Sequence, residues 1–253
     1  MSPVLLKNGF SKQLIRLLEG YAVRTTNCVA TVAIEHQRYL QKQYHKPIHY
    51  IPNGVTINPP SQPNKLLTWG LSPHQYLLYV GRLSPEKGCH YLIQAFNSLK
   101  TNLKLVIAGD ASNESQYANQ LKKMANTNVM FLGHVSGEFI NELYSNAQLY
   151  IIPSDSEGLS ISLLEAMSYG CCVLASSIKE NQDVISDCGV LFEHGNVEML
   201  LEKMHHLLNN QGLRQELGLK AKAHITKSYN WDDISCNYEK MYQDISFSAS
   251  NGC

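Results

Sequence analysis

The stretch LYIIPSDSEGLSISLLEAMSYG, residues 149–170, begins as a short apolar strand and ends as a helix. The apolar residues 149–152 are followed by Pro153, which cannot donate to a strand ladder. Gly158 allows a turn, and apolar and polar residues alternate at helical spacing from about Ser160. A strand that is apolar on both faces and is followed by a helix is typical of a parallel α/β sheet.

The same pattern of a strand followed by a helix repeats from residue 76 onward. Apolar runs predict strands at 76–80, 103–108, 129–132, 149–152, 172–175 and 190–192. Amphipathic stretches predict helices at 88–100, 114–126, 136–146, 160–169 and 181–186, then at 196–209, 212–227 and 231–246. This alternation predicts an α/β fold: a Rossmann-like doubly wound parallel sheet with helical N- and C-terminal extensions.

The first part of the chain has a different organisation. Residues 1–57 predict a helix at 11–23, a strand at 28–34, a helix at 35–44 and a strand at 48–51. These are too few βα units for a Rossmann domain and correspond to the end of one. The stretch NPPSQPN, residues 58–64, predicts a linker. We therefore expect three parts, at 1–57, 58–230 and 231–253.

The composition argues against several classes of function. In the 253-residue chain 21 Lys and Arg balance 21 Asp and Glu, so no overall positive charge attracts nucleic acid. The seven cysteines are scattered without a Cys-x-x-Cys pair, which predicts reduced thiols in a cytoplasmic protein and no metal site. We expect no membrane span and no signal peptide, because no run of 18 apolar residues occurs and the N-terminus lacks the export pattern.

Two cations follow the strand predicted at 76–80. In VGRLSPEKG, residues 80–88, Gly81 is expected to turn the backbone tightly after the strand. Arg82 and Lys87 then lie on the loop before a helix, a position that suits a diphosphate. Taken alone, the segment is equally compatible with a solvated loop that carries two surface cations.

Two carboxylates bracket the start of the helix in residues 149–170. The free N–H groups at 159–161 and the positive end of the helix favour an anion. A carboxylate can accept both hydroxyls of a vicinal diol, so Glu165 is suited to a ribose and Glu157 to a sugar. Each alone also fits a structural role, Glu157 as a charge that complements the helix dipole and Glu165 as a solvated helix position.

Together these segments resemble a known family, the retaining glycosyltransferases of family 4, which have the two-domain GT-B fold. The resemblance covers about residues 25–245, and the Glu157-x7-Glu165 segment is its most specific part. The matching segments are IPNGV (51–55), VGRLSPEKG (80–88), LVIAGD (105–110), FLGHV (131–135), EGLSISLLEAMSYG (157–170), VLAS (173–176) and ENQDVI (180–185).

The resemblance implies a role for each matching residue. Arg82, Lys87 and Glu157 would be catalytic: the two cations would bind the diphosphate of the donor, and Glu157 would contact the transferred sugar. Glu165 would bind the ribose. The full donor-binding set is Gly81, Arg82, Lys87, Gly133, His134, Val135, Glu157, Gly158, Leu159, Ser160 and Glu165. The reaction would be a hexosyl transfer with retention, without a metal, a cofactor or a covalent carboxylate nucleophile, and UDP is the favoured nucleotide.

The length departs from the family pattern. Family members carry an N-terminal Rossmann domain that binds the acceptor, and residues 1–57 match only its final helix, strand and hinge. The chain thus resembles a C-terminal donor-binding domain whose N-terminal domain is largely missing. The implied partners are a nucleotide-sugar, a saccharide or lipid-linked acceptor, and a separate N-terminal-domain protein or a second copy. Contact with a membrane would be peripheral at most.

The sequence leaves two alternative functions open. One is a truncated homologue that binds a nucleotide-sugar without transferring the sugar. The other is a nucleotide-sugar epimerase of the same fold, which needs further acid–base groups. His134 is the candidate for such a group, although a loop residue beside the nucleobase is the simpler interpretation.

Overall fold

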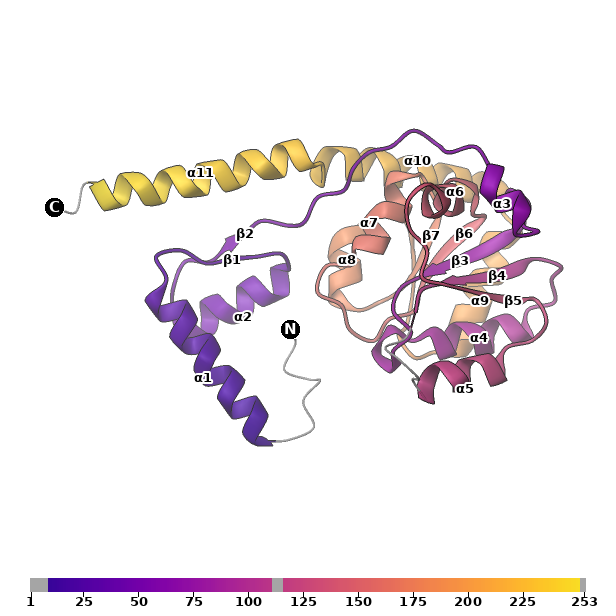
Figure 1. Cartoon of the computed structure of the whole chain (residues 1–253), viewed down its shortest axis with the longest axis horizontal. Helices are drawn as coiled ribbons and strands as arrows, with labels where there is room; N and C mark the ends of the chain where they lie inside the picture. Colours follow the sequence, from indigo (N-terminus) through magenta and orange to yellow (C-terminus); the bar gives the residue numbers. More distant parts are fainter. Residues whose placement is uncertain (1–8, 111–115, 251–253) are drawn as a thin grey trace. The chain divides into compact units, whose positions relative to one another are not determined.

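The computed structural model describes residues 9–110 and 116–250, which form two compact units (Figure 1). The larger unit is Val55–Asn230, and the smaller combines the described residues up to Gly54 with those from Trp231 onward. The chain enters and leaves the larger unit at one place. There Val55 forms a parallel bridge with Asn230, and the Val55 N–H donates to the Tyr229 carbonyl at 2.8 Å.

The larger unit is built on a parallel sheet of six strands. These are β3 (Tyr76–Val80), β4 (Lys104–Ala108), β5 (Val129–Gly133), β6 (Leu149–Ile152), β7 (Val173–Ser176) and β8 (Val190–Phe192). Their order across the sheet is β5-β4-β3-β6-β7-β8. The chain therefore builds outward from β3 in one direction and then, from β6, in the other. This confirms the predicted doubly wound, Rossmann-like architecture.

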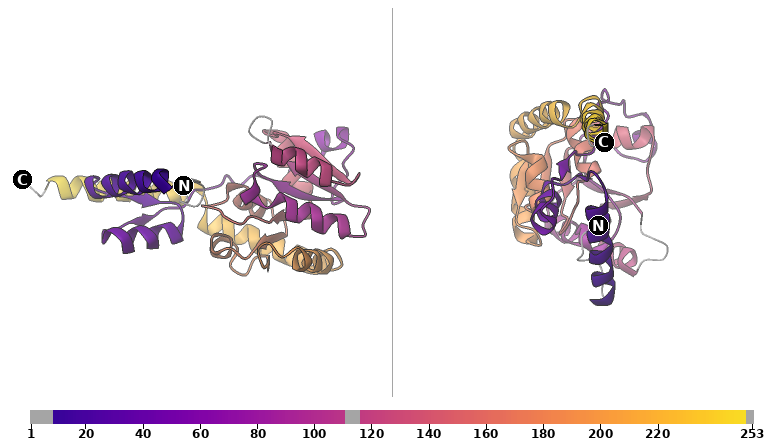
Figure 2. Two further views of the ribbon diagram at one scale, coloured as in Figure 1. Left: turned by 90° about the horizontal axis from the view of Figure 1, so that it is seen from below. Right: turned by 90° about the vertical axis from the view of Figure 1, so that its left-hand side faces the viewer.

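Helices cover both faces of this sheet (Figure 1 and Figure 2). Leu77 and Tyr79 of β3 belong to one buried cluster, and Tyr76 and Leu78 belong to the other, because successive strand residues point to opposite faces. The first cluster includes residues of α4 (Cys89–Ser98), α5 (Gln116–Met124) and α9 (Val197–Leu208). The second includes residues of α3 (Asn64–Thr68), α6 (Glu138–Asn146), α7 (Ile161–Ser168), α8 (Lys179–Ile185) and α10 (Gln211–Ser228).

The smaller unit contains α1 (Gly9–Thr25), β1 (Ala30–Thr31), α2 (Ile34–Tyr44), β2 (His49–Tyr50) and α11 (Trp231–Ser250). The two short strands pair in parallel, and Ile51 packs with Ile234 and Met241 of α11. The strands predicted at 28–34 and 48–51 are thus much shorter than expected. Four large apolar side chains of α1 are exposed: Leu14, Leu17, Leu18 and Tyr21. No described helix is both long enough and apolar enough to cross a lipid bilayer.

Candidate functional site

The loop after β3 carries the two predicted cations. A short 3-10 helix, Pro85–Lys87, ends at Gly88, whose φ of +66° is left-handed. The backbone bends at Gly81 directly after β3, as predicted, but it does so without a left-handed φ. The Gly81 N–H donates to the Ala108 carbonyl at 3.0 Å, which extends the β3–β4 ladder by one residue. A second change of direction falls at Gly88, the residue before α4.

The loop after β6 contacts the loop after β3 directly. The Asp155 N–H donates to the Glu86 carbonyl at 2.9 Å. A Cβ atom added at Gly88 would lie only 2.0 Å from the carbonyl oxygen of Pro153. The two predicted clusters, which are separated by about 70 residues of sequence, are therefore fixed side by side.

The position of these loops in the sheet is the one where ligands bind in open α/β folds. β3 and β6 are neighbours, and the chain leaves them toward opposite edges of the sheet. Connections that depart in opposite directions leave a ligand-sized crevice at the carboxyl ends of the two strands. Lys87 and Glu157 both lie on loops at this point.

Lys87 and Glu157 form a largely buried ion pair. Lys87 Nζ donates to Glu157 Oε2 at 2.6 Å, and the two side chains are 18% and 6% exposed. The second oxygen, Oε1, accepts from the Ser154 hydroxyl at 2.7 Å. Both charged residues were predicted from the sequence, but their pairing and the part of Ser154 were not. The signal for Ser154 was its place directly after the strand and Pro153, three residues before Glu157.

Arg82 lies on the same loop but is not part of this pair. Its side chain is 76% exposed, and its Nη2 lies 3.8 Å from Glu86 Oε1. Burial acts to raise the pKa of Glu86, but the Ser84 hydroxyl, the backbone amide and the charges of Arg82 and Lys87 outweigh it and lower the pKa. The Arg82 guanidinium is thus held loosely and is accessible to an anion.

Glu165 lies in α7 and is partly buried. The Ser160 hydroxyl caps this helix by accepting from the Leu163 N–H at 3.4 Å. The Tyr144 hydroxyl donates to Glu165 Oε2 at 2.9 Å. Burial raises the pKa of Glu165, and the hydrogen bond from Tyr144 acts in the opposite direction. Tyr144 was not selected from the sequence, because its spacing in an amphipathic helix is that of a core residue.

The predicted residues 133–135 also lie at the carboxyl ends of the strands, but at the end of β5. β5 ends at Gly133, which has a φ of +68°, and the Gly109 N–H donates to the Gly133 carbonyl at 2.7 Å. His134 is exposed, and Val135 is half-buried against the core. Because β4 and β3 lie between β5 and β6, a ligand that touched both ends would span about 14 Å, or three strand spacings.

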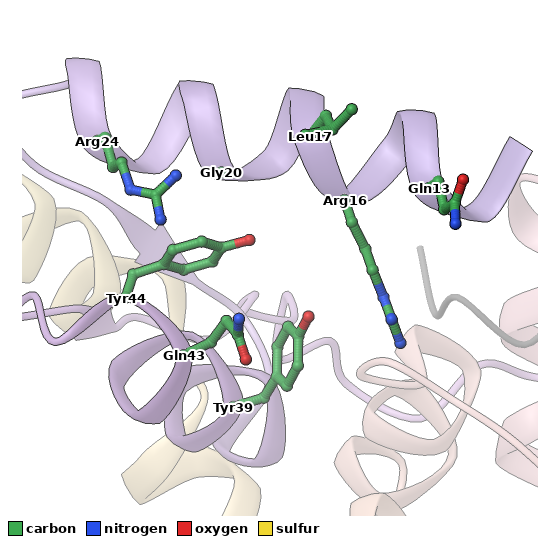
Figure 3. Close-up of a pocket in the computed structure, with 8 residues that line it drawn as sticks. All are labelled: Gln13, Arg16, Leu17, Gly20, Arg24, Tyr39, Gln43 and Tyr44. Carbon is green, nitrogen blue, oxygen red and sulfur yellow. The ribbon is translucent and has the colours of Figure 1, made fainter. Parts of the chain in front are cut away.

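Two cavities of the described residues lie away from these loops. One, of about 490 Å³, lies between α1 and α2 of the smaller unit. Figure 3 shows Arg16 and Arg24 of α1 on one side of it and Tyr39, Gln43 and Tyr44 of α2 on the other. The second, of about 360 Å³, is lined by residues that precede β3, β6 and β7 and by residues of α10, at the opposite end of the sheet from Lys87. We place the candidate site at the Lys87–Glu157 pair because the charged groups converge there.

Comparison with known proteins is consistent with this geometry. Residues 71–224 match the family model described as glycosyl transferases group 1. An uncharacterized glycosyltransferase of Methanocaldococcus jannaschii is 31% identical over 172 residues, covering 66% of this chain and 44% of the relative. The lipopolysaccharide 1,2-N-acetylglucosaminetransferase of Salmonella typhimurium is 30% identical over 184 residues, covering 66% and 48%. The chain thus spans about half the length of these relatives.

A solved structure shows the same fold. Anabaena HepE, determined in complex with UDP, superposes with a TM-score of 0.85 at 21% identity, covering 96% of this chain and 70% of that one. At this identity the likeness concerns the fold. It agrees with the strand order and the helix layers described above.

Proposed function

The chain belongs to the group 1 glycosyl transferases, and on that premise we propose that it is the donor-binding part of a retaining, family 4 type glycosyltransferase. It would take a nucleoside diphosphate sugar, with UDP as the favoured nucleotide, and transfer the hexosyl group to a saccharide or lipid-linked acceptor. The observation that supports this most is the Lys87–Glu157 pair, which lies at the switch point of the sheet beside the N-terminus of α7.

In the proposed reaction, positive charge offsets the negative charge that grows on the departing nucleoside diphosphate. Lys87 and Arg82 would supply it as side chains, and the free N–H groups at the start of α7 would supply it as a helix dipole. Glu165 would hold the ribose, and residues 133–135 would lie beside the base. These charges would stand where a metal ion stands in other phosphate sites, so we propose donor binding without a metal.

Glu157 would contact hydroxyls of the transferred sugar rather than attack it. Both of its oxygens already accept hydrogen bonds, from Lys87 at 2.6 Å and from Ser154 at 2.7 Å. A carboxylate stabilised in this way is a weak nucleophile, because attack would require it to give up charge-assisted hydrogen bonds. We therefore propose transfer on one face of the sugar, with the leaving phosphate assisting the acceptor.

The smaller unit would be the end of an N-terminal Rossmann domain, and the rest of that domain would provide the acceptor site. The exposed leucines of α1 support a partner of this kind, because Leu17 is 71% and Leu18 is 59% exposed. The partner would be a separate N-terminal-domain protein or a second copy of the chain. Any contact with a membrane would be peripheral.

Nucleotide binding tests this proposal directly. Calorimetry of the whole chain should show binding of UDP, GDP or deoxythymidine diphosphate, with UDP bound most tightly, and EDTA should leave the dissociation constant unchanged. UMP, which lacks the β-phosphate, should bind at least about tenfold more weakly. A well-folded chain that binds none of these diphosphates would contradict the proposal.

Because Arg82 is exposed, its replacement should weaken UDP binding without lowering the stability of the fold. Arg82→Ala should weaken UDP binding by roughly tenfold, since it removes one charged contact of about 1.5 kcal/mol. The free energy of unfolding should stay within about 0.5 kcal/mol of the wild type, because a surface ion pair contributes little. Titration calorimetry and urea denaturation measure the two quantities. Lys179→Ala is the matched control, since Lys179 forms an exposed i,i+4 pair with Asp183 on α8.

A further inference from the structure

Tyr144 is a buried tyrosine whose hydroxyl reaches the candidate site. It lies in α6 with 1% of its surface exposed, and its ring packs against Tyr150 and Tyr169 at centroid distances of 5.9 and 5.8 Å. The backbone at Tyr144 is held as well, since the Cys171 thiol donates to the Tyr144 carbonyl at 2.9 Å. The position of the hydroxyl is therefore fixed by packing on several sides.

The Tyr144 hydroxyl forms a hydrogen bond to one of the two carboxylate oxygens of Glu165. The Tyr144 O–H donates to Oε2 at 2.9 Å, and in the described part of the chain no residue donates to Oε1. Burial and the nearby charges raise the pKa of Tyr144 well above its ordinary value, so the hydroxyl keeps its proton and remains a donor at every working pH. One hydrogen bond therefore sets the rotation of the carboxylate and leaves Oε1 to accept from a ligand.

We propose that Tyr144 is a positioning residue for the nucleotide: it holds Oε2 of Glu165 so that Oε1 accepts the ribose hydroxyls. The inference rests on the proposed function, because it assigns the ribose to Glu165. Tyr144 touches no ligand itself and acts through the orientation and ionisation of the carboxylate. A fixed carboxylate loses less freedom when it binds the diol than a mobile one would.

The variant Tyr144→Phe keeps the ring and removes the hydroxyl. We expect its UDP dissociation constant to rise by roughly threefold to tenfold. We also expect the preference for UDP over 2′-deoxy-UDP to shrink, because the loss concerns the group that faces the 2′-hydroxyl. In a Glu165→Gln background the same substitution should have little effect on either ligand.

The pH dependence separates positioning from packing. The pKa of Glu165 is raised by burial, so UDP binding should weaken as the pH falls through that pKa and the carboxylate becomes protonated. Tyr144→Phe removes the interaction that lowers this pKa, so the loss of binding should begin at a higher pH. The UDP phosphates titrate in the same way in the experiments on the wild type and on Tyr144→Phe. A difference between the two pH profiles of UDP binding therefore comes from the protein.

Two further measurements keep the outcomes distinct. Tyr76→Phe is the matched control, because Tyr76 is also buried but its hydroxyl donates to a backbone carbonyl, that of Leu143 at 2.7 Å, and not to a carboxylate. Tyr76→Phe should lower the free energy of unfolding without shifting the pH dependence of UDP binding. Carbon-13 NMR of the glutamate carboxyls, with Glu165→Gln to assign the signal, should show the Glu165 titration at higher pH in Tyr144→Phe without any ligand.

Each result then has one meaning. Equal weakening of UDP and 2′-deoxy-UDP with an unmoved pH profile would overturn the inference and leave the proposed function intact. Absence of nucleotide binding in the wild type would overturn the proposed function and the ribose assignment with it. A shifted Glu165 titration together with a reduced preference for the 2′-hydroxyl would support the inference.

Discussion

Replacement of Lys87 by Met is expected to weaken UDP binding by roughly tenfold to a hundredfold, since a hydrogen bond to a charged group contributes about 1.5–3 kcal/mol. Two effects act in the same direction. The variant loses the ammonium group that would contact the diphosphate, and it leaves the Glu157 carboxylate, which is 6% exposed, without its cation. An unpaired carboxylate beside the site repels the incoming anion. Calorimetry at constant ionic strength measures the change.

Two companion variants test the cause. Lys104→Met removes the same charge at the amino end of β4, where Lys104 donates to the Gly70 carbonyl, and it should leave UDP binding unchanged. Glu157→Gln added to Lys87→Met should recover part of the lost stability, because the buried negative charge is gone. UDP affinity of Lys87→Met equal to that of the wild type would show that Lys87 is not part of the donor site.

Gly88→Ala is expected to lower the free energy of unfolding by about 3 kcal/mol or more. The left-handed φ of +66° costs an L residue roughly 1 kcal/mol by itself. The larger effect is steric, since the new Cβ would lie 2.0 Å from the Pro153 carbonyl oxygen, a backbone atom that no rotamer change can displace. The two loops must separate to accommodate it, so UDP binding should fall as well. Urea denaturation and calorimetry report the two losses.

Gly70→Ala is the matched control for this substitution. Gly70 has nearly the same φ, +65°, but its nearest neighbour to an added Cβ is Lys104 Nζ at 3.9 Å, an ordinary contact. It should therefore cost only the conformational penalty, about 1 kcal/mol, and leave UDP binding unchanged. Equal losses of stability in Gly88→Ala and Gly70→Ala would contradict the close approach of the two loops.

The sheet of the larger unit was predictable because its strands are apolar on both faces. The predicted strand at 76–80 is β3 to the residue, and 149–152 is β6. The predictions were wrong where the pairing of strands decides how long a strand is. The strands predicted at 28–34 and 48–51 shrink to two residues each, because among the described residues β1 and β2 pair only with each other. The helix α3 was missed, since the Leu66 N–H near its start donates to the Glu142 carboxylate of α6 and no local side chain caps the helix.

The charged residues of the candidate site were predictable, but their relations were not. Arg82, Lys87 and Glu157 stand out because they lie in the segments that follow strands, and Glu165 stands out because it lies eight residues after Glu157, in the helix α7. That Lys87 is paired while Arg82 is exposed depends on how two loops pack, and no spacing in the sequence encodes it. Tyr144 illustrates the same limit, because a buried aromatic in an amphipathic helix gives no sign of which group its hydroxyl meets.

The parallel bridge between Val55 and Asn230 makes the larger unit a candidate for transplantation. Because the Val55 N–H donates to the carbonyl of Tyr229, next to the last residue, the two ends of the unit adjoin, and a recipient protein needs only one surface loop with closely spaced ends to receive it. Such a graft would cost little closure entropy on either side. On the proposed function this unit would carry the nucleotide-sugar site, so exchanging it as one block would be a practical route to new combinations of donor and acceptor.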